Sequence, residues 1–357
     1  MRAKGASTLG RVARRAWRRG GTAERQPAWT LGEEEFADLC AARLAHVVPV
    51  REPLVLVSQI QRSGGTLLSQ LLDGHAECHA HPHELRIGRP SSRHWVRLDL
   101  DRPDTWFESL YEKYAGKHLR SGYSKDGGKR APTGNRDVFP FLFLPGLQKR
   151  IFEQTAAATR VERERDVLDC YFTSYFNAWL DNQNLYSGPK RAVTAFAPGL
   201  NLRRKSRDAF FAAYPDGKLV SIVRDARAWF ASARSQGKRD TDLDAAMERW
   251  RRSAERTLEA AGRYGDRVVA LTYEDLVRST EATMERLAAR IGISMSETLL
   301  VPTFNGRPIR ANSVERVDRH GILTERAEAY RETLDAATVA RVDELAGDLY
   351  DRVAALS

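Results

Sequence analysis

The sequence of 357 residues contains few cysteines and no long hydrophobic run. Its three cysteines, Cys40, Cys78 and Cys170, are far apart, and no C-x-x-C pair is present. Such a chain has no disulfide framework, so we expect a reducing, cytoplasmic compartment. The longest apolar stretches, 54–57 and 139–144, are much shorter than the ~20 residues that span a bilayer.

Acidic residues are absent from the first twenty positions, which hold seven basic side chains. These account for most of the formal net charge of +10. Gly20, Gly21 and Pro27 interrupt any helix, and no apolar segment follows the charges, so this is not a secretory signal. We expect residues 1–30 to form a flexible basic arm that allows weak contact with a membrane surface, and residues 31–357 to form a single domain.

Three short apolar runs are typical of buried strands, and a helical pattern follows each of them. The runs cover 53–58, 218–225 and 267–273, and further helical patterns cover 33–46, 66–72, 149–182, 226–236, 241–262, 280–291 and 335–354. Alternating strands and helices predict an α/β fold with a mainly parallel central sheet flanked by helices.

The stretch from 90 to 190 differs, since it is rich in aromatic residues and turn signals. We expect it to be an inserted, mostly helical region. Its aromatic segments 139–144 and 171–179 either pack in the core or form an apolar wall for a substrate.

A glycine-containing loop, residues 59–65, joins the first apolar run to a helix. The first N–H groups of a helix lack internal partners, its dipole favours an anion, and glycine lets the backbone approach closely. Arg62 adds a forked cation to this loop. The segment therefore predicts a phosphate site.

The spacing is not that of a nucleotide-hydrolysing P-loop, G-x-x-x-x-G-K-[S/T]. Gln59 stands where the first glycine belongs, and Gly65 stands where the lysine belongs. No apolar run ends in an obvious Mg²⁺-holding aspartate; Asp225, which follows Arg224, is the nearest case. A P-loop kinase is thus a poorly supported alternative. A second alternative is a phosphate-binding module that uses the basic arm on nucleic acid.

Several segments in order resemble the sulfotransferase family. Gln61-Arg-Ser-Gly-Gly-Thr-Leu-Leu68 is similar to its 5′-phosphosulfate loop, whose common form is Pro-[Arg/Lys]-Ser-Gly-Thr-Thr-[Leu/Trp]. Residues 218–234 resemble its second motif, a strand ending in Arg-Asp with a serine eight residues after the arginine, here Arg224 and Ser232. Residues 271–276 resemble its Tyr-Glu-Asp-Leu strand end.

The resemblance implies a P-loop-like sulfotransferase that takes a sulfuryl group from 3′-phosphoadenosine 5′-phosphosulfate (PAPS). Residues 300–322 resemble the loop that closes over this donor, where Arg316, Arg319 and His320 are unranked alternatives. The acceptor is expected to be a hydroxyl group of a carbohydrate, lipid or small molecule, and no nucleic-acid partner is expected. The implied donor contacts are Arg62, Ser63, Gly64, Gly65, Thr66, Leu67, Arg224, Ser232, Tyr273 and Ser313.

Sulfuryl transfer also needs a base for the acceptor proton. In one branch of the family, a glutamate roughly twenty residues after the loop arginine has this role. Glu84 lies 22 residues after Arg62, and His83 lies 21 after it. We therefore expect Glu84 to take the proton, with His83 as second candidate, while Arg62 stabilises the leaving phosphate.

The same segment has a metal-binding composition, because His75, Cys78, His79, His81 and His83 fall within nine residues. A spacing of two places three of the histidines on one face of a strand, where imidazoles bind zinc or line a cleft. Sulfuryl transfer itself demands no metal, and we expect none.

Overall fold

The computed structural model describes residues 32–87, 94–113, 139–235, 242–309 and 321–357. The chain divides into two compact units, residues 1–46 and 47–357. The described element of the first unit is helix α2 (Glu33–Ala45). The predicted basic arm lies outside the described residues, and the single domain from residue 31 stays a prediction.

A five-stranded sheet forms the centre of the second unit, in the order β2-β3-β1-β4-β5. All neighbouring strands are parallel, which confirms the predicted α/β fold. In register, Val55 lies opposite Thr194 on one side and Lys218 on the other. The strands are β1 (Leu54–Val57), β2 (Cys78–Glu84), β3 (Ala192–Phe196), β4 (Lys218–Val223) and β5 (Val268–Thr272).

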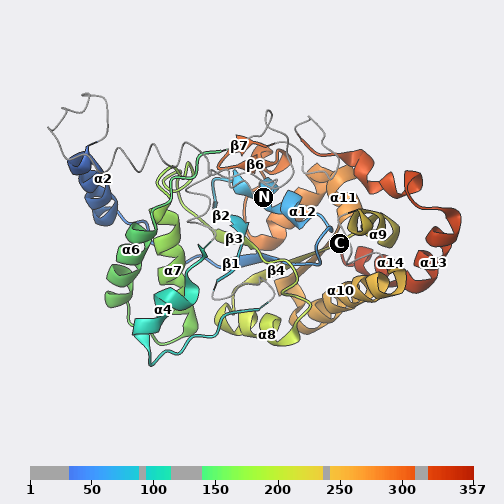
Figure 1. Cartoon of the computed structure of the whole chain (residues 1–357), viewed down its shortest axis with the longest axis horizontal. Coiled ribbons are helices and arrows are strands. Elements are labelled where there is room, and N and C mark those ends of the chain that lie inside the picture. Colours follow the sequence, from blue (N-terminus) through green and yellow to red (C-terminus); the bar gives the residue numbers. More distant parts are fainter. Residues whose placement is uncertain (1–31, 88–93, 114–138, 236–241, 310–320) are drawn as a thin grey trace, which may run out of the picture. The chain divides into compact units, whose positions relative to one another are not determined.

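Helices cover both faces of this sheet, with α8 and α10 on one side and α11 and α12 on the other (Figure 1). The helices of the second unit are α3 (Gly65–Asp73), α4 (Pro103–Leu110), α6 (Pro145–Ala157), α7 (Glu164–Ala178), α8 (Arg204–Ala213), α9 (Ala226–Arg234), α10 (Leu243–Tyr264), α11 (Tyr273–Arg278), α12 (Thr280–Ile291), α13 (Ala336–Ala346) and α14 (Leu349–Ala354). A short hairpin, β6 (Thr303–Phe304) with β7 (Arg307–Pro308), precedes the C-terminal helices.

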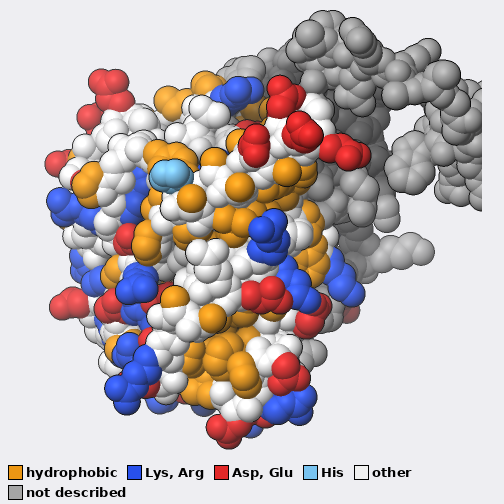
Figure 2. Space-filling model, turned by 90° about the vertical axis from the view of Figure 1, so that its left-hand side faces the viewer, with side chains coloured by type: hydrophobic (Ala, Val, Ile, Leu, Met, Phe, Trp, Pro, Cys, Tyr) orange, Lys and Arg blue, Asp and Glu red, His pale blue; other side chains and the backbone are white. Residues whose placement is uncertain are grey.

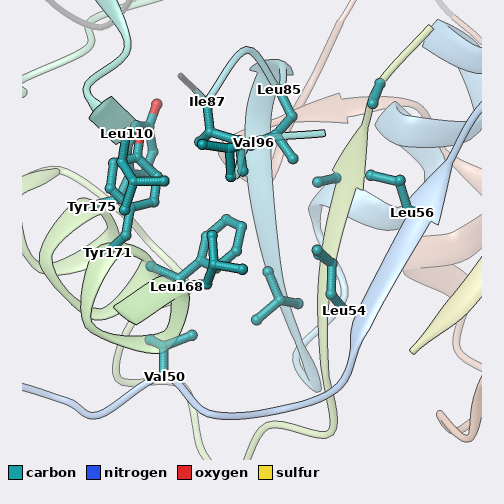
Figure 3. Close-up of a cluster of buried hydrophobic side chains, with 14 of the residues drawn as sticks. Val50, Leu54, Leu56, Leu85, Ile87, Val96, Leu110, Leu168, Tyr171 and Tyr175 are labelled. Carbon is teal, nitrogen blue, oxygen red and sulfur yellow. The ribbon is translucent and has the colours of Figure 1, made fainter. Parts of the chain in front are cut away.

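Strand β1 is apolar at every position because both of its faces are buried. Leu54 and Leu56 belong to a cluster with side chains of α7, among them Leu168 (Figure 3). Val55 and Val57 belong to a second cluster with α3 and α12. The sheet is therefore the middle of three layers, and β1 is held rigidly at its centre.

The described part of the region between β2 and β3 contains helices α4, α6 and α7, as predicted for the insertion. Its aromatic segments are largely buried, since Phe141, Phe143, Tyr171 and Tyr175 are at most 2% exposed. Core packing thus explains these aromatic side chains. Leu142, in contrast, is 51% exposed.

One predicted element is wrong in its extent. The single helix expected over 335–354 is two helices, α13 and α14, separated at Gly347. Gly347 adopts a φ of 57°, a value that glycine tolerates and that ends an α-helix.

The face that carries α4 and α6 shows Lys and Arg side chains interspersed with Asp and Glu, with hydrophobic side chains between them (Figure 2). The described part of this face has no broad area of one charge sign. Within the described residues, no helix has the length and apolar character that would let it cross a membrane.

Candidate functional site

The candidate site lies at the carboxyl ends of the strands, where the strand order reverses around β1. β3 pairs with one side of β1, and β4 pairs with the other. In the sequence, β2 lies between β1 and β3. Such a switch point leaves a crevice outside the sheet. A cavity of about 250 Å³ lies here, and residues from the ends of β2 and β3 and from the segments after β1, β4 and β5 line it.

The loop after β1 forms the floor of this cavity and has an unusual backbone. Arg62 has a φ of 74°, and Gly64 has a φ of 94°. The left-handed region costs a non-glycine residue of the order of 1 kcal/mol or more, so strain is stored at Arg62. The indole Nε1 of Trp229 donates to the carbonyl oxygen of Gln61 at 2.9 Å and ties the loop to α9.

Side chains approach the backbone closely at two glycines of this loop. A Cβ at Gly64 would lie 2.5 Å from Cδ2 of Tyr273. A Cβ at Gly65 would lie 1.8 Å from Nε2 of Gln59. The side chains of Gln59 and Phe196 thus occupy the space that a threonine or serine would need at position 65, and they would have to move to admit one. Helix α3 begins at Gly65, so its first N–H groups face the cavity without helical partners.

Arg62 and Ser232 meet at the cavity although 170 positions separate them. Nε and Nη2 of Arg62 donate to the Ser232 hydroxyl at 3.1 and 3.0 Å. Burial, and then the charge of Arg224, lower the pKa of Arg62. The loop arginine is thus partly desolvated beside a second positive charge.

Arg224 follows β4 and is 8% exposed. Its Nη1 donates to the carbonyl oxygen of Arg62 at 3.3 Å, and its guanidinium carbon lies 4.4 Å from the ring centre of Tyr273. Burial lowers the pKa of Arg224, and the negative charge of Glu274 opposes that shift. Asp225 does not pair with Arg224 but accepts the N–H groups of Arg227 and Ala228 at the start of α9.

A third arginine, Arg326, lines the same cavity, and its carbonyl oxygen accepts Nη2 of Arg224. Sequence reasoning missed Arg326. The one indication in the sequence was that Arg326 lies shortly after residues 300–322, the segment predicted to close over the donor. Three arginines therefore line a cavity whose wall carries one carboxylate among the described residues, that of Glu84. Such a cluster of like charges is stabilised by an anion.

Glu84 stands at the end of β2 and lines the cavity. Nη2 of Arg86 donates to Oε2 of Glu84, and the Glu84 side chain is 36% exposed. It is thus held by a cation yet open to a ligand. His83 does not line the cavity. Its ring is directed to other partners, since its Nε2 lies 2.9 Å from the Tyr175 hydroxyl and its Nδ1 lies 3.0 Å from the Glu84 carbonyl oxygen.

Behind β2, His81 forms a buried pair with Glu112. Nε2 of His81 lies 3.0 Å from Oε1 of Glu112, and its Nδ1 lies 2.9 Å from the carbonyl oxygen of His83. Burial alone would raise the pKa of Glu112, but the charge and hydrogen bond of His81, with His83 and the Arg86 N–H, lower it to about 2. Both ring nitrogens of His81 thus lie within hydrogen-bond distance of an oxygen atom of the protein.

His81, His83 and Glu112 are also the described residues that could hold a metal ion, since one ligand atom of each lies within 4.8 Å of the others. Hydrogen bonds within the protein account for these atoms, including one at 2.8 Å from the Tyr171 hydroxyl to Glu112. The expectation that no metal is needed stays a prediction.

The structure brings most of the predicted site residues together. Those that line the cavity are Arg62, Gly64, Gly65, Thr66, Leu67, Glu84, Arg224 and Tyr273. Ser63 is buried at 1% exposure outside the lining, and Ser232 is reached through Arg62. Ser313 and the alternatives Arg316, Arg319 and His320 lie outside the described residues. Gln59 and Phe196 also line the cavity and were missed, because neither carries a charge or a motif position.

Solved sulfotransferase structures are similar to this chain. For the sulfotransferase domain of the Synechococcus PCC 7002 olefin synthase, the identity is 18%, the TM-score is 0.46, and 90% of this chain and 97% of that chain are covered. For a sulfotransferase from Alicyclobacillus acidocaldarius, the identity is 17% and the TM-score is 0.37, and 83% of this chain and 96% of that chain are covered. For a mouse sulfotransferase complexed with PAP, the identity is 11% and the TM-score is 0.38, and 90% of this chain and 94% of that chain are covered.

A search of curated proteins gives no match to the sequence. The model of a sulfotransferase family matches residues 53–297, which is more than half of the sequence. The matched stretch includes the loop after β1, the end of β4 and the start of α11. The chain belongs to the sulfotransferase family.

Proposed function

We propose that this enzyme transfers the sulfuryl group of PAPS to a hydroxyl group of a carbohydrate, lipid or small-molecule acceptor. The observation that supports this most is the meeting of Arg62, Arg224 and Arg326 at one cavity with the carboxylate of Glu84. PAPS carries phosphate at two positions of one nucleoside, so it needs several cations in one crevice. A carboxylate beside these cations suits a proton acceptor rather than a phosphate contact.

The donor would be held from two directions. The N–H groups at the start of α3 and the Arg62 guanidinium would bind the 5′-phosphosulfate. Arg224 and Ser232 would bind the 3′-phosphate. Each Nη of Arg224 donates to one carbonyl oxygen and so retains a second N–H for this purpose. Because burial already removes water from Arg62 and Arg224, an anion gains more from them than from exposed cations.

In the proposed reaction, the acceptor oxygen forms a bond to sulfur as the bond between sulfur and the bridging oxygen breaks. The acceptor proton moves to the Glu84 carboxylate, and adenosine 3′,5′-bisphosphate leaves. Arg62 stabilises the negative charge that develops on the bridging oxygen. Arg86 keeps the Glu84 carboxylate in place before the proton arrives. His83 remains the second candidate for this proton.

The remaining wall of the cavity supports an acceptor with an apolar portion. Phe196, Pro302 and Leu323 give it an apolar side. We infer that the acceptor places an apolar portion against these residues and its hydroxyl group towards Glu84.

Transfer of labelled sulfate from PAPS to a panel of alcohols, phenols and sugars tests the proposal. We expect labelled product with at least one acceptor, at equal rates with and without a chelator of divalent ions. Labelled product that requires ATP and Mg²⁺ in place of PAPS would contradict it.

A further inference from the structure

The peptide unit that joins Arg224 to Asp225, after the end of β4, is held at both of its polar groups. Its carbonyl oxygen accepts the indole Nε1 of Trp250 in α10 at 2.8 Å. Its N–H group, that of Asp225, donates to Oε2 of Glu274 in α11 at 3.1 Å. Both partners are buried. Because a peptide unit is planar, these two hydrogen bonds fix its orientation, and with it the direction in which the Arg224 side chain leaves the backbone.

Glu274 is itself held by a residue of helix α14. The hydroxyl of Tyr350 donates to the same Oε2 atom at 2.8 Å, although 76 positions separate the two residues. Burial, and then the charge of Glu274, raise the pKa of Tyr350, so its hydroxyl stays protonated and acts as the donor. Burial raises the pKa of Glu274, and the hydrogen bonds from Tyr350 and from the Asp225 N–H oppose that shift. These two hydrogen bonds therefore favour the ionised carboxylate.

Helix α14 packs in the same core as the end of β4. Its Leu349 and Val353 belong to one hydrophobic cluster with Val223, the last residue of β4. Tyr350 thus reaches Glu274 from a helix that shares this core. Neither Glu274 nor Tyr350 lines the cavity of the three arginines, so neither contacts a ligand there.

Arg224 is the side chain that this arrangement directs, and it is the proposed contact of the 3′-phosphate. Its guanidinium carbon lies 4.4 Å from the ring centre of Tyr273, which directly precedes Glu274 in α11. Its Nη1 and Nη2 donate to the carbonyl oxygens of Arg62 and Arg326. A guanidinium binds phosphate through N–H groups of fixed direction, so its placement before binding adds to the affinity.

We propose that Tyr350 is a positioning residue of the donor site, which acts through Glu274 on the Arg224–Asp225 peptide unit and so directs the Arg224 guanidinium towards the 3′-phosphate. The inference rests on the proposed function, because that function supplies the phosphate to be bound. The donor site then depends on helix α14, to which none of the motif segments of the sequence belongs.

Tyr350→Phe tests the inference, since it removes the hydroxyl and keeps the ring. We expect its affinity for adenosine 3′,5′-bisphosphate, measured by isothermal titration calorimetry, to fall by about threefold to tenfold. Its affinity for adenosine 5′-monophosphate, which lacks the 3′-phosphate, should stay unchanged. Tyr330→Phe is the matched control and should alter neither affinity. The Tyr330 ring lies 5.1 Å from the guanidinium carbon of Arg227, and its hydroxyl has no hydrogen bond within the described residues.

A double variant separates positioning from an effect on the whole fold. In the Arg224→Ala background, Tyr350→Phe should cause no further loss of bisphosphate affinity, because the side chain that Tyr350 directs is then absent. An effect on the whole fold would lower the affinity for both nucleotides or would persist in this background. Either result would overturn the inference, as would an unchanged bisphosphate affinity in Tyr350→Phe.

Nuclear magnetic resonance of the free protein distinguishes a failure of the inference from a failure of the proposed function. Without nucleotide, Tyr350→Phe should shift the amide resonance of Asp225 and the N–H resonance of the buried Nε of Arg224, whereas Tyr330→Phe should shift neither. Unchanged resonances in Tyr350→Phe would overturn the inference. A wild-type protein that does not bind the bisphosphate would contradict the proposed function, and the resonances would still decide whether Tyr350 directs Arg224.

Discussion

The guanidinium of Arg62 donates two hydrogen bonds to the hydroxyl of Ser232, at 3.1 and 3.0 Å. One residue belongs to the loop after β1 and the other to α9, so the contact joins the two segments that were expected to hold the donor. The predicted contacts for the two phosphates thus form one connected cluster. Ser232 is placed to orient Arg62 as well as to bind an anion itself.

Replacing Ser232 by alanine should therefore weaken nucleotide binding. A hydrogen bond to a charged group contributes about 1.5–3 kcal/mol, so we expect the affinity for adenosine 3′,5′-bisphosphate to fall by about tenfold or more. Ser235→Ala is the matched control, because that hydroxyl donates to the Ser232 carbonyl oxygen at the exposed end of α9. Isothermal titration calorimetry measures both variants. Equal affinities for the two would show that the Ser232 hydroxyl has no role in binding.

Gly64→Ala should damage the loop itself. The substitution forces a Cβ to within 2.5 Å of the Tyr273 ring and strains a backbone with a φ of 94°. We expect the free energy of unfolding to fall by about 1–3 kcal/mol and nucleotide binding to be lost. Gly146→Ala in α6 meets no atom within 4 Å and should be neutral or stabilise by about 0.5–1 kcal/mol. Urea denaturation compares the two, and an equally tolerant Gly64→Ala would mean that the ring of Tyr273 moves freely.

Glu84→Gln tests the proposed base. The amide keeps the size of the side chain but cannot take a proton, so we expect turnover to fall by about 10²–10⁴-fold with nucleotide affinity unchanged. Glu108→Gln, on the exposed face of α4, should keep full activity. The measurement is the rate of labelled sulfate transfer under saturating PAPS. Full turnover in Glu84→Gln would transfer the role to His83.

Glu112→Gln should destabilise the protein because it breaks the buried pair with His81, both of whose side chains are fully buried. Removal of one partner of such a pair costs about 3–5 kcal/mol. The folded pKa of Glu112, about 2, lies below its usual value of 4.5, so its contribution to stability is present above pH 4.5 and is lost as pH falls towards 2. Urea denaturation at several pH values should show a smaller loss of stability across this range in Glu112→Gln than in the wild type. An equal loss would contradict the account of this pair.

The sequence was sufficient to predict the three strands with continuous apolar runs and a following helix. β1, β4 and β5 have this pattern because both of their faces are buried. β2 was not among the three predicted buried strands, since its Cys-His-Ala-His-Pro-His-Glu sequence is polar and contains proline; only the spacing of its histidines suggested a strand. It forms a strand because His79 and His81 pack against the aromatic side chains of α7, Phe176 and Tyr175. Helix α7 is distant from β2 in the sequence, so this packing leaves no signal in the local sequence of β2.

Among the residues of the candidate site, too, those in a recognisable sequence segment were predicted and those placed only by tertiary structure were missed. Arg62 and Arg224 were predicted because each follows a strand in a recognisable segment, and both line the cavity. Arg326 was missed because it lies in a short 3₁₀ turn with no motif. Glu112 was missed because its role depends on burial beside His81, to which the spacing of 31 residues gives no clue.

The most direct test of the central claim is calorimetric titration of the protein with adenosine 3′,5′-bisphosphate and, separately, with ATP and Mg²⁺. We expect tight binding of the bisphosphate without metal and much weaker binding of ATP. Arg62→Ala and Arg224→Ala should each lower the bisphosphate affinity by about tenfold to a hundredfold, whereas Arg227→Ala, whose guanidinium pairs with Asp225 outside the cavity lining, should not. Unchanged affinity in Arg62→Ala and Arg224→Ala, or a preference for ATP with Mg²⁺, would contradict the claim that these arginines hold one doubly phosphorylated nucleotide.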